Sequence, residues 1–158
     1  MSFQIGDTVI HSTHGLGEII RIEEKIIQGS STNCYVLRTH DLTIWIPVND
    51  LHQDSLRIPA SPDEFVRLFD ILTSPGELLP EDRVMRKDQL LEHLKDGQLA
   101  SICHVICDLT HFKRIKKLND QERSILGRAT KSLLTEWIFT LGVTQFQAQQ
   151  AMVNLLGE

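Results

Sequence analysis

The sequence predicts an α+β protein with a small β-barrel at residues 1–59 and a compact, all-helical domain at residues 61–158. As far as Ile58, β-branched and aromatic residues occur in runs separated by turn residues. After Ser61 the apolar residues recur at helical spacing and glycine becomes rare. The segment Arg57–Pro62 contains two prolines among small residues and is the expected boundary between the domains.

Three runs in the first part have the composition of antiparallel strands in a meander: residues 18–27, 34–39 and 42–48. Turn residues separate them, at Gly29–Asn33 and at His40–Asp41. Closely spaced glycines near the start of the chain predict tight turns and close strand crossings.

The run at residues 42–48 carries the clearest candidate for a protein contact. Proline cannot donate to a neighbouring strand, so Pro47 predicts a sheet edge or a bulge. An exposed edge with a tryptophan on its outer face is a candidate for pairing with a strand of another protein. Packing of Trp45 beneath the second domain is an open alternative. Strict alternation predicts a core face of Leu42, Ile44, Ile46 and Val48, and an outer face of Thr43, Trp45 and Pro47.

The first two expected helices have recognisable beginnings. Ser61–Glu64 is a capping box with proline at the first helical position. The second helix begins after Pro80–Asp82, where acidic residues favour the helix dipole, and runs to about Lys95. The first helix presents one apolar face, made of Phe65, Leu68, Phe69 and Leu72.

Three further helices are expected, the last two after the capping sequences Asn119–Glu122 and Thr144–Gln147. Gly142 closes the fourth. Their apolar faces comprise Leu99, Ile102, Cys103, Ile106 and Leu109; Ile125, Leu126, Ala129, Leu133, Trp137, Ile138 and Leu141; and Phe146, Ala151, Met152 and Leu155.

Cysteine and histidine spacing does not predict a metal site. Cys103, Cys107 and His111 share one helical face, with His104 nearby, but zinc needs a fourth ligand and structural sites use short paired spacings. Cys103 is more typical of a core residue. The three cysteines are an odd number without a disulfide framework, which fits a reducing cytosol.

The sequence contains no motif for an enzyme or a cofactor. The pair His11 and His14 lies in an expected turn without a carboxylate at motif spacing. No nucleophile motif and no phosphate-binding loop is present. No secretion signal or membrane-spanning run is found either, so we expect a cytoplasmic protein without a small-molecule substrate.

Charge argues against general binding of nucleic acid, because the formal net charge is −5. One local stretch is basic: residues 111–117 read HFKRIKK. It offers four phosphate contacts, although a solvated helix end without a ligand explains it equally well. Those four residues are Lys113, Arg114, Lys116 and Lys117.

Most of the chain resembles one family. The pattern GDTVIHSTHGLGEIIRIE, then I-x-G, YVL and a strand ending in I-P, resembles the RNA-polymerase-interacting domain of CarD/CdnL-like bacterial transcription regulators. The transcription-repair coupling factor shares this module. The resemblance continues through LRIPASPDEFVRLFDIL, LLEHLKDGQLASICHVICDL and LNDQERSILGRATKSLL. It implies a Tudor- or SH3-like barrel followed by a helical, DNA-proximal domain.

The resemblance also implies function. A non-catalytic regulator of this kind binds the RNA polymerase β subunit through its barrel and modulates promoter open complexes through its helical domain. Lys25 matches a basic family position, whereas Trp45 stands where a basic residue is common. Arg83 stands at the position of a family tryptophan that wedges into DNA, and Cys107 replaces a usual arginine. Together, the resemblance, the strand alternation and the local charge give these candidate contact residues: Lys25, Thr43, Trp45 and Pro47 for the polymerase, and Arg83, Arg86, Lys87, Lys113, Arg114, Lys116 and Lys117 for DNA.

Two alternatives stay open. One is a polymerase-bound adaptor that does not engage DNA. The other is an RNA- or ribosome-binding module of the KOW type, which the glycine-rich start also resembles. Residues 1–60 hold four Lys or Arg against seven Asp or Glu, a poor balance for gripping phosphate.

Overall fold

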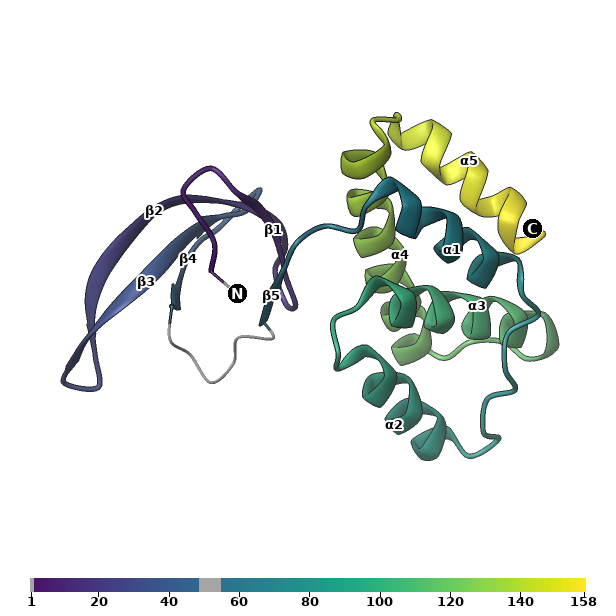
Figure 1. Cartoon of the computed structure of the whole chain (residues 1–158). Helices are drawn as coiled ribbons and strands as arrows, with labels where there is room; N and C mark the ends of the chain where they lie inside the picture. Colours follow the sequence, from purple (N-terminus) through teal and green to yellow (C-terminus); the bar gives the residue numbers. More distant parts are fainter. Residues whose placement is uncertain (1, 49–54) are drawn as a thin grey trace. The chain divides into compact units, whose positions relative to one another are not determined.

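The computed structural model describes residues 2–48 and 55–158. The chain divides into two compact units, Met1–Pro59 and Ala60–Glu158. The first unit is an antiparallel sheet and the second consists of helices, as Figure 1 shows. The predicted α+β class is therefore confirmed.

The sheet has the strand order β4-β3-β2-β1-β5, and all of its pairings are antiparallel. In Figure 1, β2 and β3 form a long, curved hairpin. A register shift between Ile19 and Arg21 interrupts the pairing of β2 with β3, and such irregularities bend a strand. The strands are β1 (Thr8–His11), β2 (Gly15–Ile27), β3 (Ser30–Arg38), β4 (Thr43–Pro47) and β5 (Leu56–Arg57).

The predicted turn at Gly29–Asn33 is wrong in its extent. The turn consists of Gln28 and Gly29, both with positive φ, and the following residues are already strand. Two positive φ values give the turn twist that suits a tight hairpin. The polar run Ser30–Asn33 pairs with Glu24–Ile27 and so extends the hairpin.

Alternation along β4 is confirmed for the core face, except at Leu42. Ile44, Ile46 and Val48 pack in the sheet core, whereas Leu42 precedes the strand and is 48% exposed. Leu42 lies where the chain turns between β3 and β4, so the strand period does not apply to it. The buried members of this core are Phe3, Val9, Ile19, Tyr35, Leu37, Ile46 and Leu56.

The structure explains why one of the glycines near the start of the chain, Gly17, has to be a glycine. A Cβ added there would lie 2.8 Å from Leu37 Cδ1 and 2.9 Å from the Arg38 carbonyl oxygen. The close approach of β2 and β3 therefore requires a residue without a side chain.

The second unit contains α1 (Pro62–Thr73), α2 (Arg83–Leu94), α3 (Leu99–Ile115), α4 (Asp120–Leu141) and α5 (Gln145–Leu156). α1, α3, α4 and α5 enclose the larger apolar core, in which Trp137 is 2% exposed. A smaller core joins α2 to α3 and α4. The predicted core positions of Cys103 and Trp137 are confirmed.

The capping sequences form to different degrees. Ser61 accepts a hydrogen bond from the Glu64 amide, but among the described residues only α4 and α5 have complete capping boxes. Gly142 adopts the left-handed conformation and ends α4 as predicted. The core position predicted for Phe146 is wrong, because this residue is 70% exposed. Ala148 and Leu156 are the buried residues of α5 instead.

Candidate functional site

β4 lies at one end of the strand order, and among the described residues it pairs only with β3. Trp45, near its middle, is half-buried. Its indole Nε1 donates a hydrogen bond to the Glu23 carboxylate, and the Lys25 ammonium lies 4.0 Å from the centre of its ring. Both partners belong to β2, so the indole reaches across β3.

The pairing register of β2, β3 and β4 explains why the indole of Trp45 can reach side chains of β2. Val36 of β3 lies between Trp45 and Arg21, so all three side chains share the outer face of the sheet. Cys34 lies in the same way between Pro47 and Glu23. Although they are on the outer face, Val36 and Cys34 are completely buried. Trp45 and its neighbours thus cover a small apolar patch within the sheet unit.

The surface around the indole is charged. Arg21 Nε donates to Glu23 at 2.7 Å, and this bond and the indole bond lower the pKa of Glu23. Glu23 is therefore ionised at neutral pH. Sequence reasoning missed Arg21 and Glu23, yet alternation from Lys25 along β2 already places all three on one face. We call Arg21, Glu23, Lys25 and Trp45 the outer-face cluster.

The other two predicted contact residues lie at the two ends of β4. Thr43 is exposed and pairs with Arg38. Pro47 lines a cavity of about 460 Å³ together with residues from the hairpin: Glu24, Ser31, Thr32 and Asn33.

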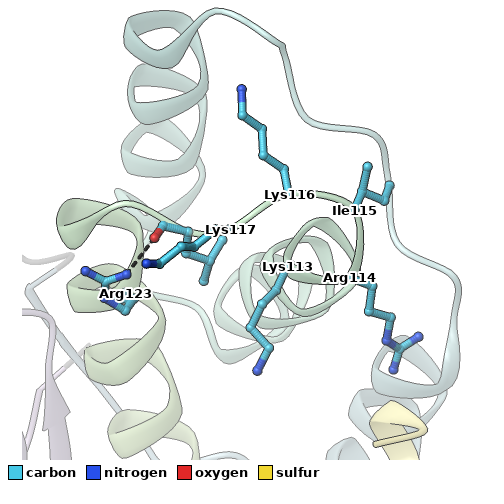
Figure 2. Close-up of a pocket in the computed structure, with 7 residues that line it drawn as sticks. Lys113, Arg114, Ile115, Lys116, Lys117 and Arg123 are labelled. Carbon is cyan, nitrogen blue, oxygen red and sulfur yellow. Dashed lines mark hydrogen bonds between the residues drawn. The ribbon is translucent and has the colours of Figure 1, made fainter.

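The basic stretch forms the end of α3 and the start of the turn to α4. Residues 113–118 and Arg123 of α4 line a cavity of about 360 Å³. Figure 2 shows these lining residues as sticks. Lys116 and Lys117 are exposed, and Lys116 points away from the other basic side chains. Sequence reasoning missed Arg123, because it lies in the next helix.

Some of these cations already have partners within the protein, which makes them less available to a phosphate group. Lys113 Nζ lies 3.5 Å from the Glu158 carboxylate, and Arg114 Nη2 donates to the Leu156 carbonyl oxygen at 2.7 Å. Arg123 donates to the Leu118 carbonyl oxygen at 2.6 Å and pairs with Asp120.

The three basic candidates of α2 have different environments. Arg83 is the first residue of α2 and is exposed, while Lys87 is half-buried. Arg86 is 4% exposed and forms an ion pair with Glu122. The guanidinium of Arg86 is thus held by partners within the protein, so its predicted DNA contact stays a prediction for which this structure does not present the side chain at the surface.

The cysteines and histidines of α3 have separate roles. Cys103 lies in the larger core, and burial raises the pKa of its thiol to about 12. Cys107 Sγ donates to the Ser74 carbonyl oxygen at 3.1 Å, and His111 Nε2 lies 3.2 Å from the same oxygen. Within residues 2–48 and 55–158, no group of three or more His, Cys, Asp or Glu could hold a metal ion.

His11 has a local structural role. Its Nδ1 accepts hydrogen bonds from the backbone amides of Thr13 and His14. Burial, followed by the neighbouring His14, lowers the pKa of His11, so the neutral ring that can accept these bonds is favoured. In the described part of the chain, no helix is sufficiently long and apolar to span a membrane.

Comparison with known proteins divides the chain at nearly the same place as the structure does. Residues 3–58 match the family model of the CarD-like/TRCF RID domain. Residues 67–153 match the model of the CarD C-terminal domain. The chain is also 28% identical over 151 residues to the Bacillus subtilis (strain 168) protein named "Putative transcription factor YdeB", covering 92% of this chain and 96% of that protein.

Proposed function

The chain belongs to the CarD-like family of transcription factors, in which the RID is an RNA-polymerase-interacting domain, and on that premise we propose that it binds the polymerase β subunit through the edge strand β4. The single observation that carries this proposal is the outer-face cluster. It places an aromatic ring and a cation on the outer face of the sheet that ends in β4, a strand that among the described residues pairs only with β3. An edge strand supplies backbone hydrogen bonds, and the side chains next to it supply specificity.

The outer-face cluster is also relevant to a difference between this chain and its family, in which a basic residue is common at the position of Trp45. Lys25 lies over the indole, so a positive charge is held on the same outer face, two strands in from the edge, although Trp45 itself is uncharged. We propose that Lys25 and Trp45 act together as the contact, with Thr43 and Pro47 at its two ends. Glu23 orients the indole through its hydrogen bond.

Calorimetry with the full chain and the polymerase β subunit tests the edge contact. Lys25→Ala removes an exposed charge at the cluster without removing the indole, and it should weaken binding by about tenfold or less, as expected for a charge at an interface rim. Trp45→Arg restores the commoner family chemistry and should bind. Equal affinity of the wild type, Lys25→Ala and Trp45→Ala would exclude the edge model.

The second half of the proposal concerns promoter DNA. Arg83, Lys116 and Lys117 are exposed basic residues of the helical unit, and we propose that they contact DNA with contributions from Lys87, Lys113 and Arg114. Arginine suits a phosphate or a narrow minor groove, whereas the family tryptophan suits a wedge between base pairs. We therefore propose that this chain stabilises promoter open complexes by charge and not by distortion of the duplex.

Salt dependence of the promoter-complex lifetime tests the DNA contact. The logarithmic slope should be only a few, because it follows the number of phosphates that are neutralised. The double reversal Lys116→Glu and Lys117→Glu should flatten this slope, whereas Lys113→Ala should change it less because Lys113 is paired with Glu158. Polymerase binding should be retained in both variants.

The adaptor without DNA engagement is the second candidate function. Burial of Arg86 and the internal partners of Lys113 and Arg114 favour it, since they reduce the free positive charge. A lifetime unchanged both by the double reversal and by Arg83→Ala, together with normal polymerase binding, would favour the adaptor and exclude the DNA contact.

A further inference from the structure

α2 is attached to the helical unit by few side chains. Its buried residues are Arg86 and Leu90. Leu90 packs in the smaller core with apolar residues of the neighbouring elements: Leu79, Val105, Leu109, Leu118 and Ile125. The buried attachment near the start of α2 is thus a charged residue.

The guanidinium of Arg86 contacts a carboxylate, two backbone carbonyl oxygens and an aromatic ring. Nε donates to the Glu122 carboxylate, while Nη1 donates to the carbonyl oxygens of Pro80 and Glu81, both at 3.0 Å. The group also lies 4.7 Å from the centre of the Phe112 ring. A planar, forked donor can satisfy several acceptors at once, which a single ammonium group cannot do in this arrangement.

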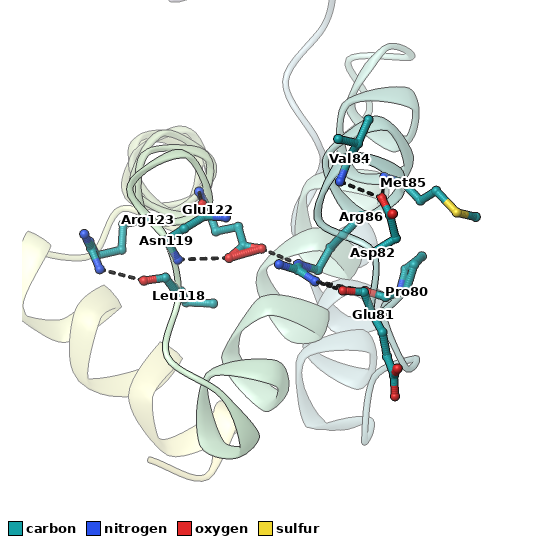
Figure 3. A network of polar contacts seen from close by, with 10 residues as sticks. All are labelled: Pro80, Glu81, Asp82, Val84, Met85, Arg86, Leu118, Asn119, Glu122 and Arg123. Carbon is teal, nitrogen blue, oxygen red and sulfur yellow. Dashed lines mark hydrogen bonds and ion pairs between the residues drawn. The ribbon is translucent and has the colours of Figure 1, made fainter.

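Glu122 uses both carboxylate oxygens, one for each helix start. Oε2 accepts from Arg86, and Oε1 accepts from the Asn119 amide at 3.0 Å to complete the capping box of α4. Figure 3 shows the resulting chain of polar contacts from Pro80 and Glu81 through Arg86 and Glu122 to Asn119. The two helix starts are therefore tied together through one buried ion pair.

We propose that Arg86 and Glu122 are a positioning pair that fixes the first turn of α2 against the α3–α4 turn. The exposed Arg83 is then held in a constant relation to Lys116 and Lys117, so the two basic segments act on the same DNA. This inference rests on the proposed DNA contact. A buried ion pair is favourable only in good geometry, and on this proposal that requirement is what specifies the orientation of α2.

The test uses a double variant that preserves the volume and the cap. Arg86→Met keeps an unbranched side chain in the pocket, and Glu122→Gln keeps a capping residue, as Gln147 does in α5. Together they remove the ion pair without leaving an unpaired buried charge. Arg86→Lys is the second variant, since it retains the charge but cannot reproduce the forked contacts.

Hydrogen exchange in the full chain measures the positioning directly. The double variant should speed exchange in the first turns of α2 by about tenfold or more, because hydrogen bonds to a charged group are lost. Exchange in α5 should stay unchanged, which shows that the unit remains folded. Arg83→Ala is the matched control and should leave exchange in α2 unchanged.

The lifetime of the promoter complex measures how the positioning of α2 affects the DNA contact. The double variant and Arg86→Lys should shorten the lifetime, although neither changes an exposed charge, and Arg83→Ala should shorten it as well. Unchanged exchange in α2 would overturn the inference, and so would faster exchange with a lifetime that only Arg83→Ala shortens. If no variant alters the lifetime, the DNA contact of the proposed function is excluded, and the functional part of this inference falls with it.

Discussion

The outer face of the sheet and the basic end of the helical unit both collect charged side chains, but these side chains differ in what they do for the fold. On the sheet, Lys25 and Glu23 contact Trp45, which helps to cover Val36 and Cys34. At the basic end, Lys116 and Lys117 are exposed. Substitution of Trp45 should therefore change folding and binding together, whereas substitution of Lys116 or Lys117 should change binding alone.

α2 repeats this contrast within a single helical turn. Arg83 is exposed, and Arg86, three residues later, is buried in an ion pair. Two residues of the same type thus have opposite roles, and what distinguishes them is the position of Glu122 in another helix.

The largest effect is expected at Arg86. Arg86→Ala should destabilise the helical unit by about 3–5 kcal/mol, because it leaves the Glu122 carboxylate buried without its partner. Arg83→Ala should change the free energy of unfolding by less than about 0.5 kcal/mol. Urea unfolding followed by far-UV circular dichroism measures both, and similar values for the two variants would break the contrast within α2.

Trp45→Ala should come next. It should lower the stability of the sheet unit by about 2 kcal/mol, since it uncovers apolar area at Val36 and Cys34. It should also weaken polymerase binding well over tenfold, as loss of an aromatic anchor does. Calorimetric titration and thermal unfolding give the two numbers. Lys117→Ala is the control from the other region, and a loss of stability there would contradict the comparison.

Two glycines extend the comparison to the packing of each unit. Gly17→Ala should destabilise the sheet unit by about 1–3 kcal/mol, because its Cβ would overlap Leu37 and the Arg38 carbonyl oxygen. Gly127 of α4 has nothing within 4 Å of an added Cβ, so Gly127→Ala should stabilise α4 by about 0.5–1 kcal/mol. Denaturant midpoints of the two variants should move in opposite directions.

An effect that depends on pH concerns Cys103. The unfolded thiol has a pKa near 9.0, and burial raises the folded value to about 12, so unfolding in alkaline solution releases a proton. The stabilisation from the protonated thiol is complete below the unfolded pKa and is lost progressively as the pH rises from the unfolded pKa to the folded one. At pH 10 the loss should be roughly 1 kcal/mol relative to pH 8. Cys103→Val should lose correspondingly less stability between these two pH values, and an identical pH dependence would refute the assignment.

Local patterns determined the class of the fold and most of its elements. Alternation identified the core face of β4, and capping residues marked where α1, α4 and α5 begin. These features depend on neighbours within one turn or one strand, so they can be read directly from the chain. The core positions predicted for Leu42 and Phe146 were wrong because both residues lie at the ends of elements. There the strand or helix periodicity no longer decides which way a side chain points.

Tertiary structure alone decided how the charged residues are used. Trp45 and Glu23 are 22 positions apart and meet only because β4 and β2 flank β3. Arg86 and Glu122 are 36 positions apart, and the same arginine without that carboxylate would be expected on the surface. A charge is buried only where a distant partner compensates for the lost hydration, and pairing over such distances depends on how whole elements pack.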